Sequence, residues 1–154
     1  MALVTLWAAL GACVNAPPRE PLNIERSEEL AEGGVFHEAR RDFEDLTLSL
    51  VVTPEASRVR LHLRVQGRQP VELEFSSSQR YDFAIANNGS EVWRWSEDKV
   101  FAQVLGTESL GPGQAPLEFE EIWQPAPPGR YRAVATITAP DRSELEVEQS
   151  FEVD

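Results

Sequence analysis

From residue 46 onward, apolar and polar side chains alternate along most of the chain. A period of two is typical of a half-buried β-strand, because successive side chains point to opposite faces of a sheet. Residues 46–53 and 58–65 are the clearest examples, and similar runs cover residues 71–75, 117–123, 131–137 and 145–153. Eight or nine short strands, with no helix longer than a few residues, favour an all-β fold. We expect an immunoglobulin-like antiparallel β-sandwich.

The stretch Phe75–Gln103 predicts the structural centre of this sandwich. Two strand-like runs flank Asn87-Asn88-Gly89, and Asn-Gly between such runs predicts a hairpin because both central residues of a type I′ turn need a positive φ. Trp93 and Trp95 share one face of the second run. We expect them to pack in the core, since buried aromatic residues dominate core energetics, and the alternative is an exposed recognition surface.

Charged residues on the outward faces predict how neighbouring strands pair. The arginines of residues 58–65 are expected to face Glu72 and Glu74 across a hairpin. The alternative is that this row docks an acidic partner. In residues 117–123 the alternation breaks before Ile122, and a β-bulge at that point would restore it.

Two further residues carry local expectations. Tyr131 follows Gly129 by two residues at the start of a strand, which suits the tyrosine corner of immunoglobulin-type sandwiches. Gln149 falls on the inward face of the last strand, where its amide would need hydrogen-bond partners.

The amino-terminal end reads as a bacterial lipoprotein leader. Residues 1–12 form an apolar run, and Leu10-Gly11-Ala12-Cys13 resembles a lipobox, although no Lys or Arg precedes the run. This predicts lipidation of Cys13, a flexible acidic tether over residues 13–45 and a folded domain over residues 46–154. The protein would then be exported to the cell envelope and held on the membrane by its lipid alone. The alternative is an apolar amino-terminal strand with an incidental cysteine in a cytoplasmic protein.

Composition narrows the classes of partner. The net charge is −12, from 26 acidic and 14 basic residues, so nucleic acid is excluded as a partner because phosphate binding needs a basic patch. The single cysteine rules out an intrachain disulfide. At 42% hydrophobic residues, the chain can form a core without one, and we expect a monomer.

The sequence also lacks the residues of common catalytic sites. Only His37 and His62 are available as histidines, the first in the predicted tether and the second on an outward strand face. A Ser-His-Asp triad or a zinc site would need partners that this chain does not offer. We therefore expect no catalytic residues, no metal, no cofactor and no enzymatic activity.

From about residue 46 to residue 153, the chain resembles the BsuPI family, named for an intracellular proteinase inhibitor of Bacillus. The matching pieces are Phe75-Ser76-Ser77 with Gln79, Tyr81-Asp82-Phe83, Val92-Trp93-Arg94-Trp95-Ser96, Phe101, Gln103, Leu110, Pro112-Gly113, Trp123 and Pro128-Gly129-Arg130-Tyr131. The resemblance implies an immunoglobulin-like β-sandwich and inhibition of a serine proteinase. Within it we take Tyr81, Phe83, Trp93, Trp95, Trp123 and Tyr131 as the structural signature.

An inhibitor of this kind must present a rigid surface to its target. Candidate contact segments are Ser96–Lys99, Gly106–Gln114 and the loop Ser76, Ser77, Ser78, Gln79 and Arg80. Arg80 or Lys99 would enter an acidic specificity pocket, or an edge strand would pair with the protease. The expected partner is a protein, a subtilisin-like serine protease. The alternative function is that of a non-inhibitory, protein-binding lipoprotein module of the envelope.

Overall fold

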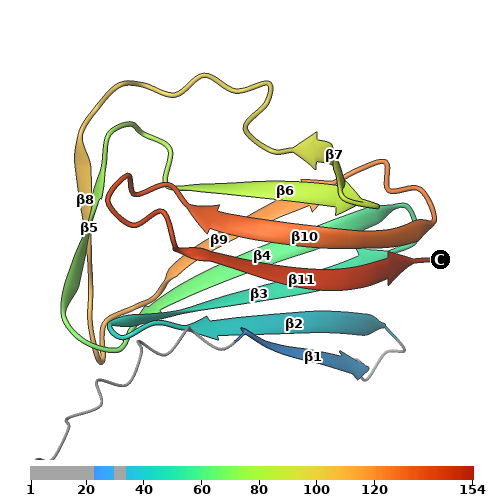
Figure 1. Ribbon diagram of the computed structural model, residues 1–154, viewed down its shortest axis with the longest axis horizontal. Helices are drawn as coiled ribbons and strands as arrows, with labels where there is room; N and C mark the ends of the chain where they lie inside the picture. Colours follow the sequence, from blue (N-terminus) through green and yellow to red (C-terminus); the bar gives the residue numbers. More distant parts are fainter. Residues whose placement is uncertain (1–22, 30–33) are drawn as a thin grey trace, which may run out of the picture.

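The computed structural model describes residues 23–29 and 34–154. Within these ranges the regular elements are all β-strands (Figure 1). The strands are β1 (Asn23–Glu29), β2 (Val35–Asp42), β3 (Leu46–Glu55), β4 (Arg58–Gly67), β5 (Val71–Phe75), β6 (Tyr81–Asn87), β7 (Ser90–Arg94), β8 (Gly106–Leu110), β9 (Leu117–Trp123), β10 (Gly129–Ile137) and β11 (Glu146–Val153). All neighbouring strands pair antiparallel.

The strands form a sandwich. One sheet has the order β1-β2-β3-β4-β9 and faces a second sheet with the order β11-β10-β6-β7. Strands β5 and β8 form a separate ribbon that closes one end of the sandwich (Figure 1). Because β4 pairs with β9 and β6 pairs with β10, long connections cross between the sheets, as in immunoglobulin-like folds. The predicted all-β, immunoglobulin-like antiparallel sandwich is confirmed.

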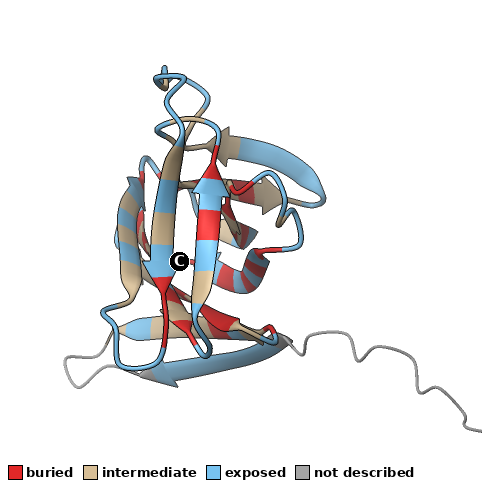
Figure 2. Cartoon of the chain, turned by 90° about the vertical axis from the view of Figure 1, so that its left-hand side faces the viewer, coloured by how far each residue is buried: buried red, intermediate tan, exposed pale blue. Residues whose placement is uncertain are grey.

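The core lies between the two large sheets and follows the predicted alternation. Leu48 and Leu50 of β3 are fully buried, as are Phe83 of β6 and Ala135 of β10. Figure 2 shows the alternation as bands of buried and exposed residues along the strands. Each fully buried leucine contributes about 1.5–3 kcal/mol through the hydrophobic effect.

Strands β1 and β2 lie in the segment predicted to be a tether. Strand β2 pairs with β3 from His37↔Val52 to Asp42↔Thr47, and Ala39 is fully buried. The prediction failed here because polar residues occupy both faces of β2, so no period of two is visible in the sequence. The strand is held by backbone pairing to β3 rather than by a continuous apolar face. Residues 1–22, which include Cys13, lie outside the described residues.

The arginine row of β4 does not face Glu72 and Glu74, so that prediction is wrong. Those glutamates lie on β5, which leaves the sheet and pairs with β8. Arg60 of β4 instead binds Glu55 at 3.1 Å and Glu120 of β9 at 3.0 Å. The acidic partners come from the preceding strand and from a strand far away in the sequence.

The expected bulge in β9 is also absent. The register between β4 and β9 is continuous from Val65↔Leu117 to Val59↔Trp123. Glu121 therefore lies on the same face as Trp123, and it is half-buried at the edge of the core. The hydroxyl of Tyr81 donates a hydrogen bond to its Oε1 at 2.5 Å, which is how an inward carboxylate is accommodated without a bulge.

The predicted turn and the predicted tyrosine corner are confirmed. Asn88 and Gly89 have φ values of 49° and 81°, as a type I′ turn requires, and they join β6 to β7. The Tyr131 hydroxyl donates to the Pro127 carbonyl at 2.9 Å, back across the start of β10. Both features lie at the same end of the second sheet, where the Asn87 side chain also donates to the Arg130 carbonyl at 2.9 Å.

Candidate functional site

Two loops meet beside the second sheet. One is Ser76–Arg80, between β5 and β6, and the other is Trp95–Leu105, the long connection from β7 to β8 that runs along the top of Figure 1. The Ser78 N–H donates to the Ala102 carbonyl at 2.8 Å, and the Ala102 N–H donates to Ser78 Oγ at 3.0 Å. This two-way contact holds the loops together, and we call the pair the braced loops.

Asp82 fixes the start of the longer loop to the sheet. Its buried carboxylate accepts hydrogen bonds from the N–H of Phe83 at 2.9 Å and from the N–H and hydroxyl of Ser96 at 3.2 and 2.6 Å. Arg94 Nη1 donates to the same carboxylate at 2.9 Å. Hydrogen bonds to Glu91 and Asp82 raise the pKa of Arg94, so it stays charged. Short polar side chains thus pin the chain where it leaves β7.

The Trp95 ring packs between the sheet and the middle of the longer loop. Its ring stacks on Tyr81 at a centroid distance of 4.4 Å and contacts Phe101 at 5.7 Å, while the Lys99 ammonium lies 4.9 Å from the centre of the indole. Burial, together with the bond to Glu121, raises the pKa of Tyr81, which keeps its hydroxyl protonated as the donor. Lys99 and Phe101 are therefore both held on the indole.

The same loop exposes three large apolar side chains among charged and polar ones. Val100 is 99% exposed, Leu105 is 84% exposed and Val104 is 59% exposed. Single exposed aliphatic residues are ordinary, whereas three within six residues are an unusual concentration, and concentrated exposed apolar side chains are typical of interaction sites. The loop combines a braced backbone with three exposed aliphatic side chains, which is an arrangement expected of a protein-binding loop.

The structure places the predicted contact residues in different roles. Arg80 binds Glu108 at 3.0 Å and the Ser77 carbonyl at 2.6 Å, and its guanidinium lies over the Phe75 ring. It also fills the space beside Gly106, where an added Cβ would lie 2.2 Å from Nη2. Arg80 therefore braces its own loop from within.

Some of the other predicted contact residues hold the loop in place, and others are exposed to solvent. The Gln79 side chain donates to the Tyr81 carbonyl at 3.1 Å, and Ser77 Oγ accepts from the Gln79 N–H at 3.2 Å. Ser76 and Ser78 are exposed, and Ser78 joins the two loops. The predicted contact segment Gly106–Gln114 is largely strand, because it contains β8.

Sequence reasoning missed the exposed apolar residues of the longer loop. It read residues 100–104 as a short apolar run, and such runs usually enter a core. The sequence holds no signal for this exposure, because it depends on contacts that form only in the folded protein. The signature aromatics are packed as expected: Phe83 and Trp123 are buried, and Tyr81, Trp93, Trp95 and Tyr131 pack against the core.

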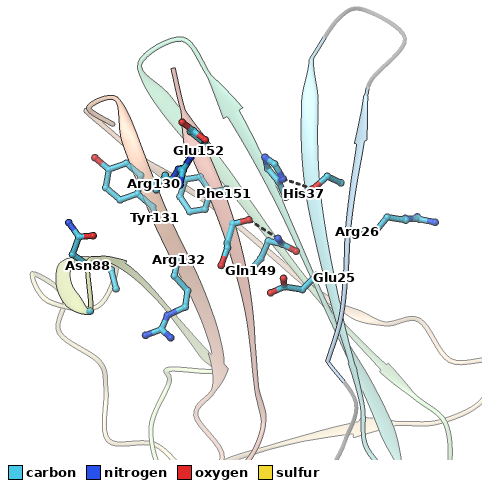
Figure 3. A pocket seen from close by; sticks show the side chains of 14 residues that line it. Glu25, Arg26, His37, Asn88, Arg130, Tyr131, Arg132, Gln149, Phe151 and Glu152 are labelled. Carbon is cyan, nitrogen blue, oxygen red and sulfur yellow. Dashed lines mark hydrogen bonds and ion pairs between the residues drawn. The ribbon is translucent and has the colours of Figure 1, made fainter.

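A groove of about 670 Å³ lies between the paired strands β1 and β2, strands β10 and β11, and the turn at Asn88 and Gly89 (Figure 3). Arg130 and Arg132 on its wall each lie 3.5 Å from a glutamate of β11. Gln149 is 3% exposed and its amide donates to the Ser150 carbonyl at 2.6 Å, whereas its Oε1 has no partner among the described residues. Most charges of the groove are thus satisfied locally.

The family model BsuPI, described as an intracellular proteinase inhibitor, matches residues 45–142, which include both braced loops. The chain belongs to the BsuPI family. No curated protein matches it.

A solved structure that resembles the chain is the CARDB domain of a Pyrococcus furiosus protein, crystallised with di-metal ions. The two are 14% identical, the match covers 96% of this chain and 100% of that domain, and the TM-score is 0.37. At this TM-score the likeness carries no functional argument. In the part of the chain that the structure describes, no group of three His, Cys, Asp or Glu residues is placed to hold a metal.

The prediction of an exported, membrane-anchored lipoprotein is wrong, because the BsuPI family is described as intracellular. The prediction rested on residues 1–13, where a short apolar run ends in small residues and a cysteine without a preceding basic residue. Among the described residues, no helix has the length and apolarity to cross a membrane.

Proposed function

We propose that this protein inhibits a serine protease by placing the braced loops over the active-site cleft, with a subtilisin-like enzyme as the first target to test. Membership of a proteinase inhibitor family supports this function. The observation that carries the proposal is the outer face of Trp95–Leu105, where Val100 is fully exposed although its flanking residues are held on Trp95.

The physical reason is preorganisation. A flexible loop loses conformational entropy when it binds, about 0.5–1.5 kcal/mol for each side chain that is immobilised. The braced loops lose most of this conformational entropy when the protein folds, before any protease binds, because Ser78, Asp82 and Trp95 already hold the backbone. A loop that stays rigid in the cleft also resists the distortion that productive cleavage requires.

The test is a titration of the full chain against active-site-titrated proteases. The panel contains subtilisin-like, trypsin-like and elastase-like serine proteases, with a cysteine protease and a metalloprotease as class controls. We expect stoichiometric inhibition of at least one serine protease and none of the two controls. Absence of inhibition across the panel at micromolar concentration would contradict the proposal.

A matched pair of variants tests whether the brace matters. Ser78→Ala removes the hydroxyl that accepts from Ala102, and we expect inhibition to weaken about 2- to 10-fold, the equivalent of one hydrogen bond. Ser76→Ala changes an exposed serine of the same loop and serves as the control. Equal inhibition constants for the two variants would argue against a role for the brace.

A further inference from the structure

We infer that Val100 is the residue that enters the primary specificity pocket of the protease, and that the partner therefore prefers small aliphatic side chains. This inference rests on the proposed function and deepens it. At 99%, Val100 is the most exposed large apolar side chain in the described part of the chain.

The neighbours of Val100 leave its side chain as the projecting group. Lys99 and Phe101 both lie against the Trp95 ring, the first through its ammonium and the second through its phenyl ring. One residue further on, Ala102 is tied to Ser78 through both its N–H and its carbonyl. Contacts on both sides of Val100 thus hold its neighbours in place, while its own side chain is almost wholly exposed.

The basic residues of this region are engaged elsewhere. The Arg80 guanidinium is bound to Glu108 and the Ser77 carbonyl. The Lys99 ammonium lies over the indole and 3.8 Å from Asp98. For either residue to fill an acidic pocket, these contacts would have to break, whereas Val100 needs no rearrangement. A partner that cleaves after basic residues is therefore disfavoured.

Leu105 is the competing candidate, and its setting is weaker. It is 84% exposed, but it lies directly before β8, between exposed Val104 and Gly106, whereas both neighbours of Val100 contact the Trp95 ring. Valine is also branched at Cβ and has few rotamers to lose on entering a pocket. A shallow apolar pocket fits this side chain better than a deep or charged one.

The experiment compares variants of the full chain on an elastase-like, a subtilisin-like and a trypsin-like protease. For the wild type we expect the strongest inhibition of the proteases that accept small aliphatic residues. Val100→Asp should weaken that inhibition by more than about 100-fold, because it places a charge in an apolar pocket. Val100→Lys should shift the preference towards the trypsin-like enzyme.

The matched control is Val35→Asp, since Val35 is an exposed valine (45%) at the start of β2, outside the braced loops. Its inhibition constants should equal those of the wild type, and none of the three variants should lower the melting temperature appreciably. If the wild type inhibits but Val100→Asp behaves like Val35→Asp, the assignment of Val100 fails and the proposed function stands. If the wild type inhibits no protease in the panel, both fail.

Discussion

Replacement of Asp82 by alanine tests how firmly the longer loop is attached to the sandwich. The Asp82 side chain is 10% exposed and accepts four hydrogen bonds, from Phe83, Arg94 and, twice, Ser96. The substitution removes an acceptor at the point where the chain leaves β7. It leaves the Ser96 N–H without its partner, although Arg94 keeps its bonds to Glu91.

The magnitude follows from the kind of contact that is lost. Removing one partner from a buried, hydrogen-bonded ion pair costs about 3–5 kcal/mol. Because the Arg94 side chain is 40% exposed and retains Glu91, water and that carboxylate take up part of the loss. We therefore expect the free energy of unfolding to fall by about 3 kcal/mol, which lowers Tm by about 6–12 °C for a chain of this size.

Urea unfolding followed by tryptophan fluorescence measures this change, with Asp98→Ala as the control. The Asp98 side chain is 88% exposed, so its removal should change stability by less than about 0.5 kcal/mol. Asp82→Asn keeps an acceptor for the backbone N–H groups and should lose about half as much as Asp82→Ala. A loss below about 1 kcal/mol for Asp82→Ala would refute the view that this carboxylate anchors the loop.

Three further predictions concern single contacts. Tyr81→Phe removes the donor to Glu121 and should cost about 1–2 kcal/mol in urea unfolding; an unchanged midpoint would contradict the role of that bond. Trp95→Ala removes the platform under the longer loop, and we expect inhibition to weaken more than stability alone explains, measured well below the melting temperature of the variant. The hydrogen bonds from Arg142 lower the pKa of Asp45 below its ordinary 3.8. Ionised Asp45 therefore stabilises the fold above its unfolded pKa, and this contribution is lost as pH falls through the lower folded pKa. Asp45→Asn should make the acid dependence of stability shallower below about pH 4, and an equally steep dependence in both proteins would count against it.

The strand faces and the tight turns of this fold can be predicted from the sequence. Alternating residues gave β3 and β4 their faces, and the Asn-Gly signal located the turn at Asn88 and Gly89. Tyr131 could be placed because a tyrosine corner needs only a glycine and a carbonyl within a few residues. Each of these features depends on residues that are close in the chain.

What could not be predicted depends on residues that are distant in the chain. Strand β2 has no apolar face of its own and is defined by its partner β3. The destination of β5 depends on β8, a strand about thirty residues later, so the partners of Glu72 and Glu74 could not be read from adjacent strands.

The candidate site was only partly predictable for the same reason. The Ser76–Arg80 loop was recognisable from its polar composition, but its contact with Ala102 forms only in the folded protein. The exposure of Val100 is a consequence of that contact and of the Trp95 platform. In the sequence alone, an apolar residue beside Phe101 reads as part of the core.

The most direct measurement is amide hydrogen exchange of the full chain, alone and bound to the protease that it inhibits best. We predict that binding slows amide exchange in residues 76–80 and 96–105. Exchange in the strands that line the groove between β1, β2, β10 and β11 should stay unchanged. Inhibition accompanied by protection at that groove or along an edge strand, with the braced loops unchanged, would contradict the account.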